Sequence, residues 1–146
     1  LAPLGPVYQA GTLSGNPLAT AAGITVLGAM DRAAYDVLTT KAQNFAAQLQ
    51  QVIRDNGLYA IVPTQGSLLG LYLARSESAA PTNFDEAKVL CDNGLYRTFF
   101  HEMLSRGIAM APGAYEIMFL SMAHSQEDLD ATLRAAAEAA RATANG

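Results

Sequence analysis

A glycine-rich loop, Gly11–Gly15, carries the first residues whose types and spacing could do chemistry. It contains two hydroxyls and leads into Asn16-Pro17, a pair typical of a helix N-terminus. Free backbone N–H groups and the positive end of a helix dipole favour an anion there, and the hydroxyls of Thr12 and Ser14 could bond to a phosphate. The Gly-Lys-Ser/Thr ending of a P-loop is missing. The residues alone therefore also allow a capped helix after an ordinary turn.

A second candidate is the carboxylate of Glu116, which lies between Pro112-Gly113 and the apolar run Ile117–Leu120. A carboxylate at the entry to a buried strand has to be solvated, paired or functional. We interpret Glu116 as a placed acid, and the alternative is a surface carboxylate at the end of a strand.

The other reactive side chains lack the spacing or surroundings that catalysis and metal binding require. His101 and His124 have no partner at metal-ligand spacing, so we expect both to be structural and expect no metal site. Cys91 has no Cys-x-x-Cys partner and is predicted to be a small buried side chain. The two lysines, Lys41 and Lys88, lie in polar contexts, unlike a lysine whose pKa is lowered for Schiff-base chemistry.

Hydrophobic spacing and turn residues predict the elements of the first third of the chain. A short strand near Val7–Gln9 and a helix over residues 17–30 come first, followed by a helix over 32–55 that ends at Asn56-Gly57. The apolar positions are Leu18, Ala22, Val26 and Met30 in the first helix, and Tyr35, Leu38, Ala42, Phe45, Leu49 and Val52 in the second.

The remaining two thirds alternate strands and helices. Strands are expected at Tyr59–Val62, Ser67–Ala74, Ile108–Met110 and Ile117–Ser121. Helices are expected over 84–105, whole or broken at Asn93-Gly94, and over 126–143 after a capping-box-like Ser125 and Asp128. The order indicates an α+β fold, with a small, mostly antiparallel sheet and helices packed on one side of it.

Composition bounds the function further. The chain has 146 residues, of which 51% are hydrophobic and 15% charged, and this argues against disorder. The net charge of −4 makes nucleic acid a poor partner. No apolar run approaches the roughly 20 residues of a membrane helix, and a single cysteine fits a reducing compartment. We therefore expect a cytoplasmic protein with neither nucleic acid nor membrane as partner.

Three segments resemble one enzyme family. The run Gly5–Pro17, which includes Tyr-Gln-Ala-Gly-Thr-Leu-Ser-Gly-Asn-Pro, closely resembles a signature of the glutamate-1-semialdehyde 2,1-aminomutase family. The segment from Arg106 to Pro112 and the ending Ser121–Asp130, with its Ala-His pair, resemble later parts of the same family. These enzymes are class III, fold-type-I pyridoxal-phosphate aminotransferases. The resemblance covers essentially the whole chain, but only the C-terminal third or so of such an enzyme.

The resemblance implies a C-terminal small domain over residues 31–146. Residues 1–30 would form the end of the large cofactor domain, an interface loop and a linking helix. It also implies that Gly11 and Thr12 contact the phosphate of pyridoxal 5'-phosphate across a homodimer, and that Tyr8 and Glu116 lie in the substrate pocket. The cofactor would alternate with its pyridoxamine 5'-phosphate form while glutamate-1-semialdehyde becomes 5-aminolevulinate. The Schiff-base lysine would lie in the missing large domain, so this chain alone is expected to be inactive and to hold no catalytic residue.

The sequence departs from the family at the glutamate, and two other functions stay open. The family usually has Phe-Glu-Ala-Gly-Phe where this chain has Tyr115–Phe119, so Ile117 and Met118 replace smaller side chains near the pocket. One alternative is the C-terminal part of another class III aminotransferase, of the ornithine or ω-amino-acid type, although the Ala-His ending argues against it. The other alternative is a non-catalytic binding or assembly module, which the missing lysine favours.

Overall fold

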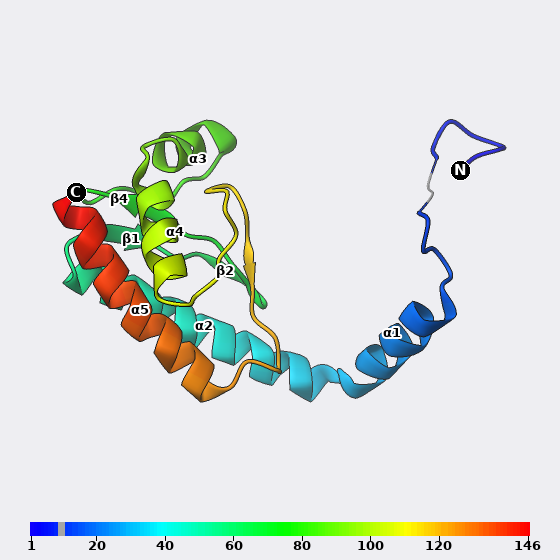
Figure 1. The fold of residues 1–146 in the computed structure, drawn as a ribbon. Helices are drawn as coiled ribbons and strands as arrows, with labels where there is room; N and C mark the ends of the chain where they lie inside the picture. Colours follow the sequence, from blue (N-terminus) through cyan, green and yellow to red (C-terminus); the bar gives the residue numbers. More distant parts are fainter. Residues whose placement is uncertain (9–10) are drawn as a thin grey trace. The chain divides into compact units, whose positions relative to one another are not determined.

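A computed structural model describes residues 1–8 and 11–146 of the chain (Figure 1). The chain divides into two compact units, Leu1–Tyr35 and Asp36–Gly146. The strand predicted near Val7–Gln9 is absent where it can be judged, because Val7 and Tyr8 lie in irregular chain. Gln9 lies outside the described residues.

The first unit contains α1, Pro17–Ala29, which begins one residue after a capping side chain. The Asn16 Oδ1 accepts hydrogen bonds from the N–H groups of Leu18 and Ala19, both at 3.1 Å. The predicted helix therefore forms with the predicted cap. Its predicted apolar face is not covered within the unit, because α1 has no buried residue and Leu18 is 82% exposed.

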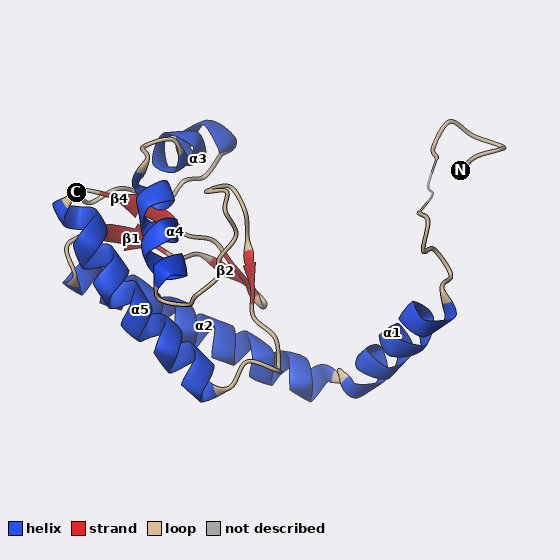
Figure 2. Ribbon diagram, in the orientation of Figure 1, coloured by secondary structure: helices blue, strands red, loops and turns tan. Residues whose placement is uncertain are grey.

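Four helices contribute to the second unit: α2 (Arg32–Asp55), α3 (Phe84–Cys91), α4 (Leu95–Ser105) and α5 (Gln126–Asn145), drawn in blue in Figure 2. The chain breaks between α3 and α4 because Gly94 has a φ of 80°, in the left-handed region that favours glycine. The predicted capping box is present at the start of α5, between Ser125 and Asp128. Within the described residues, no helix is both long and apolar enough to cross a membrane.

The strands form two small antiparallel sheets instead of one. β1 (Tyr59–Ile61) pairs with β4 (Tyr72–Ala74), while β3 (Leu68–Leu69) lies between β2 (Thr64–Gln65) and β5 (Met118–Phe119). The α+β class and the antiparallel pairing are confirmed.

Two of the predicted strands are wrong in detail. The run Ser67–Ala74 is not one strand, because it is interrupted opposite Pro63, which has no N–H group to donate to the ladder; the Gly70 N–H still donates to the Pro63 carbonyl at 3.0 Å. Its two halves join different sheets. The segment Ile108–Met110 is not a strand, since the Ile108 N–H closes the end of α4 by donating to the Met103 carbonyl.

The core of the second unit lies between its helices and its strands. On α2 the predicted Leu38, Ala42, Phe45 and Leu49 are buried, whereas Tyr35 is 50% exposed and Val52 is half-buried. Ile53 takes the buried position instead of Val52. The largest fully buried side chains come from three helices and two strands: Ile53, Leu69, Leu73, Phe99, Met103 and Thr143.

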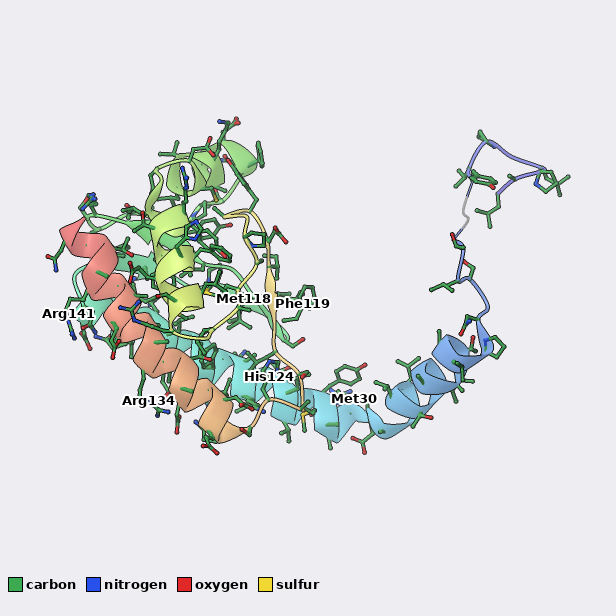
Figure 3. All side chains as sticks on the ribbon, viewed as in Figure 1. Met30, Met118, Phe119, His124, Arg134 and Arg141 are labelled. Atoms are coloured by element: carbon green, nitrogen blue, oxygen red, sulfur yellow. The ribbon has the colours of Figure 1, made fainter. Side chains whose placement is uncertain are left out.

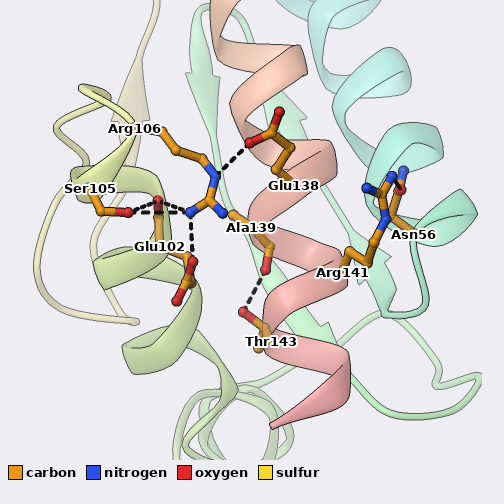
Figure 4. A network of polar contacts seen from close by, with 8 residues as sticks. All are labelled: Asn56, Glu102, Ser105, Arg106, Glu138, Ala139, Arg141 and Thr143. Carbon is orange, nitrogen blue, oxygen red and sulfur yellow. Dashed lines mark hydrogen bonds and ion pairs between the residues drawn. The ribbon is translucent and has the colours of Figure 1, made fainter.

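Polar contacts fix the C-terminal helix α5 against the neighbouring helices (Figure 4). Arg106, just after α4, donates from Nη1 to Glu102 Oε2 at 2.6 Å and from Nε to Glu138 Oε2 on α5 at 3.0 Å. At the other end, Arg141 donates to Asn56 Oδ1 at 2.7 Å, just beyond α2. The helices of the second unit are thus joined by the core, by an ion pair between Arg106 and Glu138, and by a hydrogen bond between Arg141 and Asn56.

Candidate functional site

The loop Gly11–Gly15 forms a tight turn in the first unit. The Ser14 N–H donates to the Gly11 carbonyl and the Asn16 N–H donates to the Leu13 carbonyl, both at 3.0 Å. A Cβ placed on Gly11 would lie 2.9 Å from Ser14 Oγ, closer than real side chains approach. A side chain at position 11 would therefore require the Ser14 hydroxyl to rotate away, whereas glycine leaves the turn as it is.

The start of α1 supplies fewer donors than the sequence predicted. Pro17 has no N–H group, and the next two N–H groups, of Leu18 and Ala19, already donate to Asn16. The prediction of free helix-start N–H groups is therefore wrong. An anion bound here would depend on the loop itself, where the hydroxyls of Thr12 and Ser14 are exposed. The loop fits a phosphate, whose oxygens accept hydrogen bonds from hydroxyls, and Tyr8 is 80% exposed in the same unit.

Glu116 lies in the second unit, in the segment between α4 and β5. Its Oε1 accepts from the Gly113 N–H at 3.2 Å, and its side chain is exposed. It lines a cleft of about 230 Å³, with Tyr72, Phe84 and Tyr115 among its neighbours. The strand that follows is not buried as expected, since Phe119 is 68% exposed (Figure 3). The Glu116 carboxylate is thus open to a ligand.

The segment that carries Glu116 is held by side chains from α3 and α4. The Tyr96 hydroxyl donates to the Ala111 carbonyl at 2.6 Å, and Cys91 Sγ donates to the Ala114 carbonyl at 3.4 Å. Tyr96 is buried, and this burial, followed by the charge of Glu116, raises the pKa of Tyr96 to about 12.

Tyr115 adds a third contact, directly beside the glutamate. Its hydroxyl donates to Asp92 Oδ1 at 2.6 Å, and its ring stacks on Phe84 with centroids 5.9 Å apart. The hydrogen bond to Asp92 raises the pKa of Tyr115 to about 12. Sequence reasoning did not find this pair. The one available signal is that tyrosine replaces the phenylalanine usual before the family's glutamate.

Both lysines are engaged in polar contacts. Lys88 Nζ pairs with Asp92 Oδ2 at 2.5 Å, and this hydrogen bond raises the pKa of Lys88. Lys41 Nζ donates to the His124 carbonyl. Neither environment resembles that of a neutral, desolvated lysine.

Both histidines make local contacts and are exposed, and Cys91 is buried as predicted. The His124 Nδ1 accepts from the Ser121 N–H at 3.1 Å, and the His101 ring packs edge-on against Phe100, with centroids 5.2 Å apart. Cys91 is buried, and burial raises the pKa of its thiol.

A larger cavity lies between α2 and the start of α5, away from the predicted site residues. It has a volume of about 580 Å³, and Lys41, Asn44 and His124 are among its lining residues. Across residues 1–8 and 11–146, no three His, Cys, Asp or Glu side chains come together as a metal site would require. The candidate site residues thus belong to two parts of the chain, the Gly11–Gly15 turn in the first unit and the Glu116 cleft in the second.

Comparison with known proteins identifies sequence relatives along nearly the whole chain. The chain is 44% identical over 140 residues to the glutamate-1-semialdehyde 2,1-aminomutase of Psychrobacter cryohalolentis, and 43% identical over 140 residues to that of Psychrobacter arcticus. Each match covers 94% of this chain and 32% of the relative. The chain thus spans about a third of the length of the curated relatives it matches. No protein-family model matches it.

Solved structures share the fold. A transaminase with bound PLP has a TM-score of 0.69 at 18% identity, over 95% of this chain and 30% of its own. An omega-transaminase from Sphaerobacter thermophilus also has a TM-score of 0.69, at 23% identity, over 100% of this chain and 33% of its own. The resemblance predicted from the sequence and the predicted fold class are both confirmed.

Proposed function

We propose that this chain is the C-terminal part of a glutamate-1-semialdehyde 2,1-aminomutase. The observation that carries the proposal is the 44% identity over 94% of the chain to an enzyme of that name. The reaction exchanges the amino group and the aldehyde oxygen within one carbon skeleton and yields 5-aminolevulinate, a tetrapyrrole precursor. Because the exchange is internal, it consumes no second amino acceptor.

In this proposal the chain is one part of a longer homodimeric, cytoplasmic enzyme. Residues 31–146 are its small domain, and residues 1–30 are the end of the large domain, the interface loop and the linking helix. The proposal is supported by matches that cover only 32% of each relative. The chain by itself is inactive, because the large domain carries the reactive lysine.

The chain's role is to hold the cofactor's phosphate and to form one wall of the substrate pocket. Bound pyridoxal phosphate, or its pyridoxamine form, supplies the electron sink for carbanion chemistry. The Thr12 hydroxyl would donate a hydrogen bond to the phosphate of the partner subunit's cofactor, and Gly11 would let the backbone come close to that phosphate. Tyr8 and Glu116 face the substrate. Support comes from the exposed hydroxyls of Thr12 and Ser14 in the turn and from the exposed carboxylate of Glu116 in its cleft.

The reactive lysine lies outside this chain. Lys88 is held in its charged form by Asp92, which opposes the loss of a proton that a nucleophilic amine requires. Lys41 is tied to the carbonyl of His124. We expect neither to form a covalent bond to the cofactor.

The deciding experiment assays the whole gene product that contains these residues. We expect it to convert glutamate-1-semialdehyde to 5-aminolevulinate with no keto acid added. An ω-transaminase, the alternative suggested by the shared fold, would turn over only when a keto acid acceptor is supplied. Turnover that depends strictly on added keto acid would overturn the aminomutase assignment.

A second measurement tests where the reactive lysine lies. The 146-residue chain is incubated with pyridoxal phosphate, reduced with borohydride and weighed by intact-mass spectrometry. We expect no stoichiometric adduct on the chain, and one adduct per subunit on the whole gene product. A stoichiometric adduct on Lys41 or Lys88 of the isolated chain would contradict the proposal.

A further inference from the structure

Glu116 lies at the end of the short segment Ala111–Glu116, which is not part of a helix or strand. A side chain on irregular chain is positioned only as well as that chain is held. This segment contacts α3 and α4 through two carbonyls, those of Ala111 and Ala114. Those contacts end two residues before Glu116.

The Gly113 N–H donates to the Glu116 carboxylate from within the segment, and the contact with another element that lies nearest to Glu116 is made by the adjacent residue. Tyr115 reaches across to Asp92, just after α3, and its ring stacks on Phe84 at the start of the same helix. The two Asp92 oxygens have separate partners, since Oδ1 accepts from Tyr115 and Oδ2 from Lys88. These contacts lower the pKa of Asp92, so the acceptor is ionised at neutral pH. A hydrogen bond to an ionised acceptor is stronger than a neutral one.

We infer that Tyr115 and Asp92 form a latch that fixes the orientation of Glu116 toward the substrate. The inference rests on the proposed role of Glu116 in the substrate pocket. Both are positioning residues, because they act through Glu116. The latch is specific to a chain that has tyrosine at this position, since phenylalanine would keep the ring stack and lose the hydrogen bond to Asp92.

Because the latch acts only on the position of Glu116, its loss should affect substrate binding more than the chemical steps of the reaction. If Glu116 contacts the substrate, a looser segment lowers the fraction of enzyme with the carboxylate correctly placed, and the apparent affinity falls in proportion. The reactive lysine lies elsewhere in the proposed enzyme, so bound substrate reacts at a similar rate. Loss of the latch should therefore raise KM more than it lowers kcat.

The test uses the whole gene product with Tyr115→Phe and Asp92→Asn, singly and together. Each single variant should raise KM for glutamate-1-semialdehyde by about three- to tenfold with kcat changed less than twofold, the size expected for one exposed charge-assisted hydrogen bond. The double variant should be no worse than Tyr115→Phe alone, because both changes act on the same hydrogen bond: Tyr115→Phe removes its donor, and Asp92→Asn removes the charge of its acceptor. Tyr59→Phe, which removes a tyrosine hydroxyl on β1, serves as the matched control with unchanged KM.

Glu116→Gln separates positioning from general loosening of the fold. In that background Tyr115→Phe should produce no further rise in KM, because the group that the latch positions is already altered. An equal rise in KM with and without the Glu116 carboxylate would overturn the inference. So would a double variant whose KM rise is the product of the two single rises.

The latch is also measured without turnover. At pH 11 the Asp92→Asn variant should ionise a larger fraction of one tyrosine than the parent in ultraviolet absorbance, because the Asp92 carboxylate that raises the pKa of Tyr115 to about 12 has lost its charge in the variant. Equal ionisation would show that the pair does not form and would overturn the latch whatever the activity. If the parent enzyme makes no 5-aminolevulinate but the tyrosine difference is present, the proposed function fails while the latch itself stands.

Discussion

The helices α1 and α5 differ in what their side chains do within the chain. α1 carries no acidic or basic side chain and buries none of its 13 residues. α5 has charged side chains along its exposed face and buries six of its 20 residues, including Leu129 and Ala136. The core of Asp36–Gly146 therefore stabilises α5, whereas no described residue of Leu1–Tyr35 outside α1 and its cap covers a side chain of α1. Packing within the first unit therefore does not explain why the side chains of α1 are apolar.

The largest expected difference between the two units comes from matched truncations of apolar side chains. Phe99→Ala on α4 should lower the free energy of unfolding of the 146-residue chain by about 3–5 kcal/mol, because Phe99 is fully buried and its loss leaves a cavity. Leu18→Ala on α1 should change it by less than about 0.5 kcal/mol, since Leu18 is 82% exposed. Urea unfolding followed by circular dichroism measures both.

The comparison between the units would break if Leu18→Ala were as costly as Phe99→Ala. That result would mean that α1 is buried in the isolated chain in solution. Ala21→Gly, in the interior of α1, provides a control for helix propensity alone, with an expected cost of about 1 kcal/mol confined to that helix.

The next largest effect concerns binding at the Gly11–Gly15 turn in the whole gene product. Thr12→Val keeps the shape of the side chain and removes the hydroxyl, so the Kd for pyridoxal phosphate should rise about tenfold. Thr25→Val is the matched control, because the Thr25 hydroxyl already donates to the Ala21 carbonyl on α1. Equilibrium dialysis measures the Kd of both variants. An equal change in Kd would contradict the assignment of Thr12 to the phosphate site.

Local signals in the sequence predicted most of the helices, whereas contacts between distant residues decided what was missed. Asn16 and Ser125 mark helix starts, and Gly94 marks the break between α3 and α4. The split of Ser67–Ala74 could not be predicted locally, because its halves pair with different strands, β1 for one and both β2 and β5 for the other.

The candidate site was predictable to a different extent in its two parts. The turn at Gly11 was visible as a glycine-rich run before a capped helix, and the resemblance added a role for Thr12. Asn16 accepts hydrogen bonds from the first N–H groups of α1. This depends on the orientation of its side chain, which the residue types alone do not determine. The Tyr115–Asp92 bond joins residues 23 positions apart, and no local pattern indicates it.

The two helix caps offer a smaller but closely matched test. Asn16→Ala and Ser125→Ala remove the same kind of hydrogen bond, each costing a helix about 1 kcal/mol. Ser125→Ala should lower the Tm of the chain, because α5 unfolds together with the core. Asn16→Ala should reduce helix content without moving the Tm, and hydrogen exchange should show the change only within α1. A fall in Tm with Asn16→Ala would show that α1 folds together with the second unit.

The smallest expected effect is on the acid stability of the second unit. Hydrogen bonds from Lys88 and Tyr115 lower the pKa of Asp92 below its ordinary value of 3.8, and those from Ser125 do the same for Asp128. Because each folded pKa lies below the unfolded one, the unfolded chain takes up protons first as the pH falls. The stabilisation is complete above the unfolded pKa and is lost as the pH falls through the folded values.

Urea unfolding at pH 7, 4 and 3 should therefore show a falling free energy of unfolding with a shallower fall in Asp92→Asn, because that variant has one fewer carboxylate to protonate. Asp128→Asn should also make the fall shallower, because the Asp128 carboxylate is held by Ser125 at the start of α5, the helix that the core stabilises. A slope unchanged in both variants would show that these two carboxylates do not contribute to the acid stability of the second unit.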